Sequence, residues 1–280
     1  MIQWQNADYT TLADVKARLG ITEASEDALI AGFISQASAR ISAYARRVFV
    51  PYRGTLTLDA VPPGWIGRVV FLEEDVLQAD EIKVGGEIVT DYVLRPTREA
   101  PRALLIFGQN ASLQYSDPLG AGQIIGTFGY HSDYSRAWRS VDTLTAGVTS
   151  SGTVLSVNSV SALDERGLRR FTRGDYVRVG SEFMRVLSVN TSVNQMTVDR
   201  GIRGTTAAAH SSGAAVSVYR QMEDVKAAAE MLAVYLYQNK NAVQDVVQVV
   251  GQALTIHADA VARSLQMISP YVRSYWGAVV

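Results

Sequence analysis

The alternation of hydrophobic and polar residues divides the chain into helical and extended stretches. As far as Pro51, hydrophobic residues recur every three or four positions, which is the spacing of one face of a helix. A short helix is predicted to begin after a cap at Thr10 or Thr11 and to end at Gly20. A longer helix follows, and Pro51 is predicted to end it. Its predicted buried face consists of Leu29, Phe33, Ala37, Ile41, Tyr44 and Val48.

The spacing then changes to the alternation that is typical of strands, over residues 55–130. Gly85-Gly86 separates two β-rich runs there and predicts a two-residue hairpin. Residues 142–219 form a second predicted β stretch, richer in Ser, Thr, Val and Gly, with another tight turn expected at Gly180-Ser181. Helical spacing returns at about 221–239 and about 257–275, and the β-branched run Val246–Val250 between them is predicted to be extended.

This order of elements predicts an α+β fold with three parts. Helices from both chain ends are expected to form one domain, made of residues 1–141 and 220–280, which also contains the β region at about 55–130. Residues 142–219 are expected to be a small all-β barrel or sandwich that is inserted into this domain.

Composition excludes several classes of protein. A hydrophobic content of 48% excludes wholesale disorder, and the apolar runs are too short to span a bilayer. The first residues lack the basic and apolar regions of a secretory signal, and the absence of cysteine excludes disulfides and thiol chemistry. Folding in a reducing cytoplasm is therefore expected. The net charge is −1, and no segment has the basic excess of a free-standing nucleic-acid binder.

No pattern predicts an enzyme, a metal site or a cofactor. The chain has three histidines, His131, His210 and His257. They lack the paired spacing of metal ligands and are expected at the surface or in loops. The acidic run Glu73-Glu74-Asp75 is interpreted as a solvated loop rather than a metal site. Gly120, Gly122 and Gly126 are one residue away from a dinucleotide fingerprint, but they precede a strand and predict a turn.

Arginine is far more frequent than lysine, and two arginine groups are candidates for contact with DNA or an acidic partner. The first group, late in the second helix, is Arg40, Arg46 and Arg47. The second group, in the later β stretch, is Arg166, Arg169, Arg170 and Arg173. Acidic residues flank the second group, so local neutralisation is the default interpretation. A candidate partner interface near the end of the chain has the composition of binding hot spots and consists of Tyr271, Arg273, Tyr275 and Trp276.

Several short motifs occur in a particular order along the chain. They are TLADVKARLGI at 11–21, ISAYARR at 41–47, IKVGGE at 82–87, IIGTFGY at 124–130, EDVKAAA at 223–229 and ISPYVR at 268–273. In this order they resemble the head–tail connector (adaptor) proteins of tailed bacteriophages. Within the later β stretch, RGIRGTTAAAH at 200–210 is similar to a segment that recurs in phage virion proteins. Ordinary adaptors lack the insertion at 142–219.

The resemblance implies a structural virion protein of the phage neck, assembled in the host cytoplasm. It implies a ring of about twelve copies beneath the portal, joining the DNA-filled capsid to the tail. The expected partners are other copies of the chain, the portal protein, a tail-terminator or other neck protein, and DNA that passes through the channel during ejection without sequence-specific binding. No cofactor and no membrane are expected. The arginine groups are candidates for the ring or channel side.

Two other classes remain open. A receptor- or carbohydrate-binding tail or baseplate component would use the later β stretch as its binding module. Such a module would need an exposed aromatic platform, and residues 142–219 contain only Phe171, Tyr176, Phe183 and Tyr219 as aromatic residues. An enzyme of the virion would need a convergent polar cleft, which the sequence does not indicate.

Overall fold

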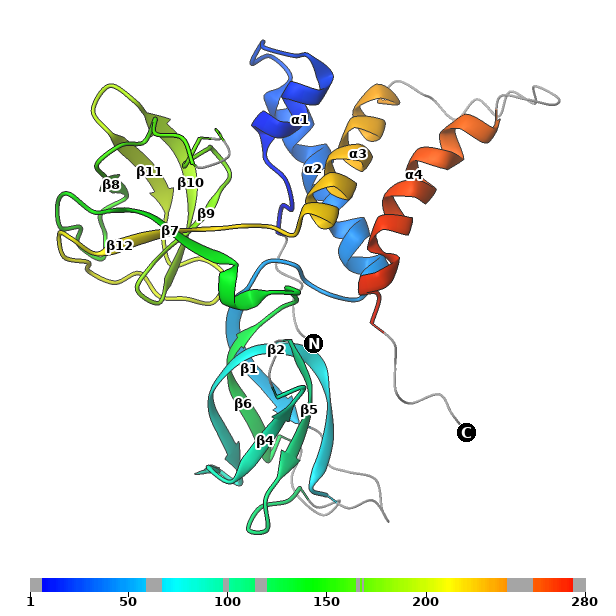
Figure 1. Cartoon of the computed structure of the whole chain (residues 1–280), viewed down its shortest axis with the longest axis vertical. Helices are drawn as coiled ribbons and strands as arrows, with labels where there is room; N and C mark the ends of the chain where they lie inside the picture. The colour runs from blue at the N-terminus through cyan, green and yellow to red at the C-terminus, as the bar shows by residue number, and fades with distance from the viewer. Residues whose placement is uncertain are drawn as a thin grey trace. The chain divides into compact units, whose positions relative to one another are not determined.

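The computed structural model describes residues 7–58, 67–97, 101–113, 120–164, 167, 169–240 and 254–273. These residues contain helices and two six-stranded sheets, which confirms the α+β class (Figure 1). They divide into two compact units. The first unit comprises residues 7–46 and 138–273, and the second comprises residues 47–137. The predicted division into a helical domain and a 142–219 insertion stays a prediction.

The first helix, α1 (Leu12–Leu19), has the predicted ends. The Thr11 side chain accepts a hydrogen bond from the Asp14 amide at 3.2 Å and so caps the helix. Gly20 ends it at φ 68°, in the left-handed conformation that favours glycine. Both signals are local, because each depends on the backbone within one turn of the residue concerned.

The second helix, α2 (Asp27–Ala45), ends earlier than predicted. Arg46 takes a left-handed conformation at φ 54°, and the carbonyl of Ala45 accepts a hydrogen bond from the Arg273 amide. The prediction that Pro51 ends the helix is therefore wrong. Val48, Phe49 and Val50 follow the helix as buried, non-helical residues of the second unit.

The buried face of α2 is also shifted from the predicted face. Leu29 and Tyr44 are exposed by 43% and 41%, whereas Ala37 and Ile41 are buried as expected. The face that packs inward consists of Ile30, Ile34, Ala37, Ser38, Ile41 and Ala45. It meets Leu232 and Ala233 of α3 (Glu223–Gln238), which lies close to its predicted range. The fourth helix, α4 (Leu254–Ile268), and the turn η2 (Ser269–Tyr271) follow.

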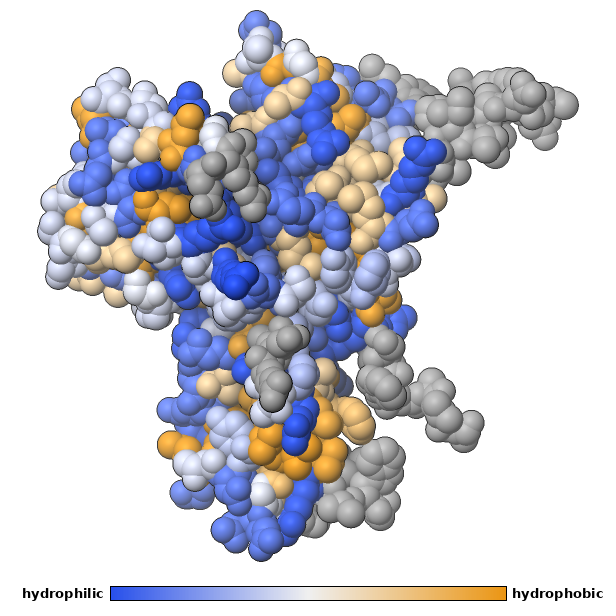
Figure 2. Space-filling view, viewed as in Figure 1, coloured by the Kyte–Doolittle hydropathy of each residue, from blue (hydrophilic) through white to orange (hydrophobic). Residues whose placement is uncertain are grey.

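The second unit is built on an antiparallel sheet with strand order β1-β6-β2-β5-β4. Its strands are β1 (Tyr52–Leu58), β2 (Val69–Val84), β3 (Glu87–Ile88), β4 (Tyr92–Arg95), β5 (Arg102–Phe107) and β6 (Gly122–Phe128). The long strand β2 pairs with β5 at its start and with β6 at its end, and β3 folds back on it through the predicted Gly85-Gly86 hairpin. The short helix η1 (Tyr134–Arg136) follows. Figure 2 shows apolar side chains gathered over the region of β4 and β5.

The sheet of the first unit has strand order β7-β12-β9-β10-β11-β8, and all its pairs are antiparallel. Its strands are β7 (Trp138–Thr143), β8 (Val154–Ser156), β9 (Tyr176–Val179), β10 (Glu182–Asn190), β11 (Gln195–Asp199) and β12 (Ala215–Tyr219). The tight turn expected at Gly180-Ser181 joins β9 to β10. A bridge between Leu144 and Val157 links the ends of the two outermost strands.

Candidate functional site

The turn between α1 and α2 is held by one lysine. Lys16 Nζ donates to the carbonyl oxygens of Thr22 and Glu23, at 3.4 and 2.7 Å, and to Asp27 Oδ1 at 2.6 Å. Its side chain is only 14% exposed. Because two carbonyl oxygens of the connection and the carboxylate of the first residue of α2 converge on this ammonium group, Lys16 ties the end of α1 to the start of α2.

A buried carboxylate attaches these helices to the C-terminal half of the chain. Glu230 of α3 lies 2.5 Å from Arg18 Nε and accepts a hydrogen bond from Thr10 at 3.3 Å. Lys226, one turn earlier, lies 3.0 Å from Asp14 of α1. Since a buried charge is tolerated only when it is paired, these contacts indicate that α1, α2 and α3 form one packed group.

The sheet of the first unit is also attached to the helices by polar contacts. The Asp8 carboxylate accepts hydrogen bonds from Ser35 of α2, at 2.8 Å, and from Arg185 of β10. The Asp8 amide donates to the Tyr176 hydroxyl at 3.2 Å. Nearby, burial raises the pKa of Asp175 to about 7, although the Thr172 amide bond opposes this shift. The hydrogen bonds of Asp8 therefore attach this sheet directly to the helices.

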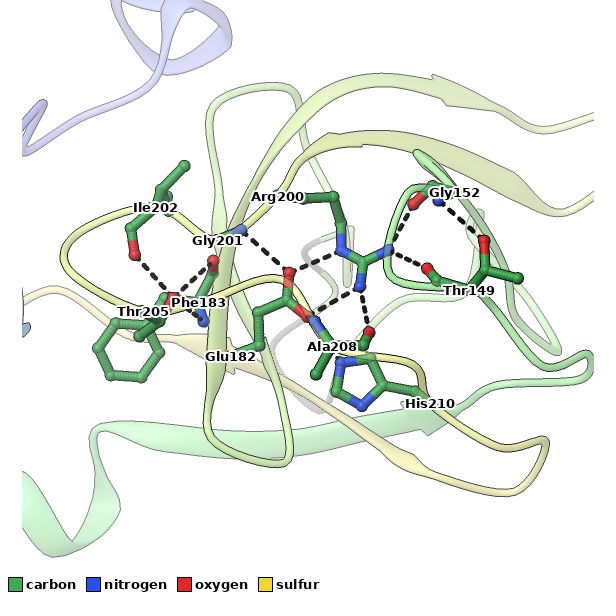
Figure 3. Close-up of polar contacts among 10 residues, drawn as sticks. All are labelled: Thr149, Gly152, Glu182, Phe183, Arg200, Gly201, Ile202, Thr205, Ala208 and His210. Atoms are coloured by element: carbon green, nitrogen blue, oxygen red, sulfur yellow. Dashed lines mark hydrogen bonds and ion pairs between the residues drawn. The ribbon is translucent and has the colours of Figure 1, made fainter.

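The motif at 200–210 wraps around one carboxylate, that of Glu182 (Figure 3). The Glu182 side chain is 1% exposed and pairs with Arg200 through two bonds, Nε to Oε1 at 2.6 Å and Nη2 to Oε2 at 2.8 Å. The amides of Gly201 and Ala208 each donate to the same carboxylate at 3.0 Å. His210 Nε2 lies 2.8 Å from Oε2. Five polar contacts thus converge on one buried side chain.

The Arg200 guanidinium extends the network to the loop before β8. It donates to the carbonyl oxygens of Thr149 at 3.0 Å and of Gly152, and to that of Ala208 at 2.6 Å. At the other end of the motif, Thr205 Oγ1 accepts from the Phe183 amide at 3.0 Å (Figure 3). These bonds close the loop on both sides of Glu182. The arrangement suits a structural clamp, because the carboxylate is already occupied by groups of the protein.

Two opposing effects set the charge of Glu182. Burial disfavours the ionised form, but the bonds from Arg200, from the Ala208 amide and from His210 together outweigh burial and lower the pKa of Glu182 to about 2. The sequence motif included Arg200 and His210 but not Glu182. No local pattern marks this glutamate, because its partners are 18 or more residues further along the chain.

The acidic run and the histidines lie in different surroundings. Glu73-Glu74-Asp75 belongs to β2 and is not a solvated loop, because Asp75 is 3% exposed and its Oδ2 lies 3.1 Å from Arg47 Nε. His131 is buried, and its Nδ1 accepts a hydrogen bond from the Asp133 amide at 3.0 Å. The side chain of His257 lies outside the described residues. In the part of the chain that the structure describes, no three His, Asp or Glu residues form a possible metal cluster.

The first arginine group divides by burial. Arg40 is exposed on α2 and Arg46 is exposed at its end. Arg47 is half-buried in the second unit, where its guanidinium lies 4.0 Å from the centre of the Tyr130 ring and beside Asp75. Arg47 is therefore engaged by its own unit.

The second arginine group and the C-terminal candidates are only partly described. Arg169 and Arg173 are exposed, whereas Arg170 donates to the carbonyl of Val141 at 3.0 Å. The Tyr271 hydroxyl donates to Asp224 at 2.7 Å, and Arg273 is half-buried. Three candidates, Arg166, Tyr275 and Trp276, lie outside the described residues. The roles of all these candidates stay predictions.

Comparison with known proteins adds one positive finding. Residues 9–68 match the family model described as the phage gp6-like head-tail connector protein. The matched segment includes α1, α2 and β1. No curated protein matches the chain. Among the described helices, none is both long enough and apolar enough to cross a membrane.

The match agrees with the motifs at 11–21 and 41–47, which lie inside the matched segment. It indicates a structural role at the junction of a phage head and tail, within the virion and in contact with other phage proteins. The resemblance to head–tail connectors is therefore confirmed by the match of residues 9–68 to the phage gp6-like head-tail connector family.

Proposed function

We propose that this chain is one subunit of the ring that joins the DNA-filled head of a tailed phage to its tail. The family match over residues 9–68 carries the proposal. The packing supports it, because α1 and α2 of the matched segment bury their apolar faces against α3 from the other half of the chain. As in the resembling connectors, the ring has about twelve copies, binds the portal on one side and a tail-terminator or neck protein on the other, and surrounds the exiting DNA.

The outward side of α2 offers a contact between copies. Leu29 and Tyr44 are exposed by more than 40% although both are apolar or aromatic, and Arg40 is exposed on the same helix. A ring that closes needs a heterologous contact, in which one face of a subunit meets a different face of the next. This side of α2 is proposed for the contact because it belongs to the segment that matches the connector family.

The sheet of the first unit acts as a rigid attachment rather than a ligand-binding module. We propose that it closes into a small barrel, in which the Leu144–Val157 bridge joins the outermost strands. The four aromatic residues of this stretch are at most 7% exposed: Phe171, Tyr176, Phe183 and Tyr219. They do not provide the exposed platform that a carbohydrate-binding component would need, which favours the connector over that alternative.

Electron microscopy of a mutant lysate tests the function. In a phage that carries a nonsense codon early in this gene, we expect filled or leaking heads beside complete, unattached tails. A suppressor host is the control and should restore joined particles. Joined particles that fail only in adsorption would overturn the connector proposal and favour a receptor-binding component.

The mass of the purified assembly tests the contact between copies. Leu29→Asp and Tyr44→Asp place a charge on the outward side of α2 and should reduce the assembled mass towards that of the monomer in native mass spectrometry. Val193→Asp is the matched control, because Val193 is a 55% exposed apolar residue in the turn between β10 and β11, away from α2 in the sequence. An assembly of unchanged mass in both α2 variants would contradict this choice of interface.

A further inference from the structure

The strand β4 has an unused edge within the described residues. It is the last strand on its side of the sheet and pairs only with β5. The Gly108 amide donates to the Asp91 carbonyl, and antiparallel bonds alternate along a strand. The backbone groups of Tyr92 and Leu94 therefore point away from β5. Such an edge is a template for pairing with a further strand.

A groove runs along this edge. Its volume is about 470 Å³, and its lining includes Tyr92, Val93 and Leu94 of β4 together with Leu77 and Ala79 of β2. Leu77 lies at an irregularity in the pairing of β2 with β6, and its carbonyl accepts a hydrogen bond from Arg102 at 2.9 Å. The groove thus combines a free strand edge with a lining in which apolar side chains lie beside the polar side chains of Gln78, Thr97 and Arg102.

The row of side chains that contains Val93 is apolar across the neighbouring strands as well. Val93, Ile106 and Val69 lie side by side across β4, β5 and β2. Val93 is 38% exposed and Phe71, in the next row, is 48% exposed. Apolar side chains are visible in this region of the surface (Figure 2). A strand that paired with β4 would therefore meet apolar neighbours on both of its faces, with alternate residues on the side of Val93 and on the side of Tyr92 and Leu94.

We propose that residues Val246–Val250 of a second copy of this chain add to β4 as a further strand. This run lies between α3 and α4, outside the described residues, and has the sequence Val-Val-Gln-Val-Val. In an extended conformation Val247 and Val249 form a wholly apolar face, and Gln248 lies between Val246 and Val250 on the other face. Its five residues are one more than the four residues of β4, so the run is long enough to pair along the whole strand.

The proposal rests on the proposed ring and specifies one of its contacts. Strand addition places a segment of one subunit in a groove of the next, so it is heterologous and repeats around a closed ring. Main-chain hydrogen bonds supply affinity in this binding mode, and alternate side chains supply specificity. Gln248, the polar residue of the run, belongs on the same side as Val93, which is 38% exposed, while Val247 and Val249 belong on the side of Tyr92 and Leu94.

Cross-linking of single-cysteine variants tests the contact, because the chain has no cysteine of its own. Val93→Cys and Gln248→Cys chains, distinguished by different affinity tags, are co-expressed and treated with a short bismaleimide. We expect a covalent dimer that contains both tags. Thr55→Cys on β1, an exposed position at the other end of the same sheet, replaces Val93→Cys as the matched control and should not give this dimer. Adding Val249→Asp to the Gln248→Cys chain should reduce the dimer to the control level.

Each outcome decides a different point. A full-size assembly with no dimer above the control overturns the strand addition while the ring stands. A chain that carries both Val93→Cys and Gln248→Cys and cross-links only within itself overturns donation between copies. If neither an assembly nor a dimer forms, both the strand addition and the proposed ring are overturned.

Discussion

Replacing Glu182 with glutamine tests whether the motif at 200–210 depends on one buried charge. Glu182→Gln keeps the size of the side chain but removes the charge, and an amide nitrogen cannot accept the bonds that Oε2 receives from Arg200, the Ala208 amide and His210. The substitution therefore leaves a guanidinium that is 6% exposed without its carboxylate, although Arg200 retains its carbonyl partners.

The pKa gives the magnitude. Lowering the pKa of Glu182 from its ordinary value of 4.5 to about 2 corresponds to about 3 kcal/mol of folding free energy at neutral pH. The loss of one partner from a buried ion pair is expected to cost about 3–5 kcal/mol, which agrees. Because the pKa is lower in the folded state, this stabilisation is complete above pH 4.5 and is lost as the pH falls towards 2.

Hydrogen exchange measured by mass spectrometry on the full chain is the suitable assay. The chain has two compact units, so a single unfolding transition does not isolate the sheet that contains β10 and β11. We expect Glu182→Gln to reduce the opening free energy of these strands by about 3 kcal/mol at neutral pH, and by progressively less below pH 4.5. Glu87→Gln is the matched control, since Glu87 is exposed in β3 and its change should stay within about 0.5 kcal/mol.

Two results would refute this reasoning. One is a difference between Glu182→Gln and the wild type at neutral pH that is no larger than the difference for Glu87→Gln. The other is a large difference that does not shrink as the pH is lowered below 4.5, because the stabilisation would then not come from the ionised carboxylate.

Three further predictions concern single positions. A Cβ at Gly126 would lie 2.1 Å from the Gln78 carbonyl oxygen, whereas a Cβ at its cross-strand partner Gly54 would meet only a ring atom at 4.0 Å. We therefore expect Gly126→Ala to lower the melting temperature, measured by circular dichroism, by several degrees, and Gly54→Ala to leave it unchanged. Asp175→Asn should be more stable than the wild type at pH 8 but not at pH 4. The pKa of Asp175 is raised to about 7 in the folded state, so the wild type loses stability as the pH rises from 3.8 through this value. Equal hydrogen-exchange rates of β9 in both proteins at pH 8 would contradict this prediction. Thr11→Ala should lower the opening free energy of α1 by about 1 kcal/mol through loss of its cap, as measured by hydrogen exchange, and Thr11→Ser should restore most of it.

The sequence alone determined those features that depend on neighbouring residues. The cap at Thr11, the end of α1 at Gly20 and the turns at Gly85-Gly86 and Gly180-Ser181 each follow from the conformational preferences of a few adjacent residues. The order of motifs also indicated the connector family, which the match at 9–68 confirmed. These signals remain readable because the atoms that produce them lie within one turn of the backbone.

Tertiary packing decided the rest. α2 carries apolar residues on two faces, and contact with Leu232 and Ala233 of α3 selected the face that is buried. Glu182 became the centre of a polar network only because β10 and the loop after β11 meet in space. The groove beside β4 brings together side chains of β2 and β4, two strands that do not pair with each other. In each case the deciding interaction joins residues far apart in the sequence, and no local pattern records which distant surfaces will meet.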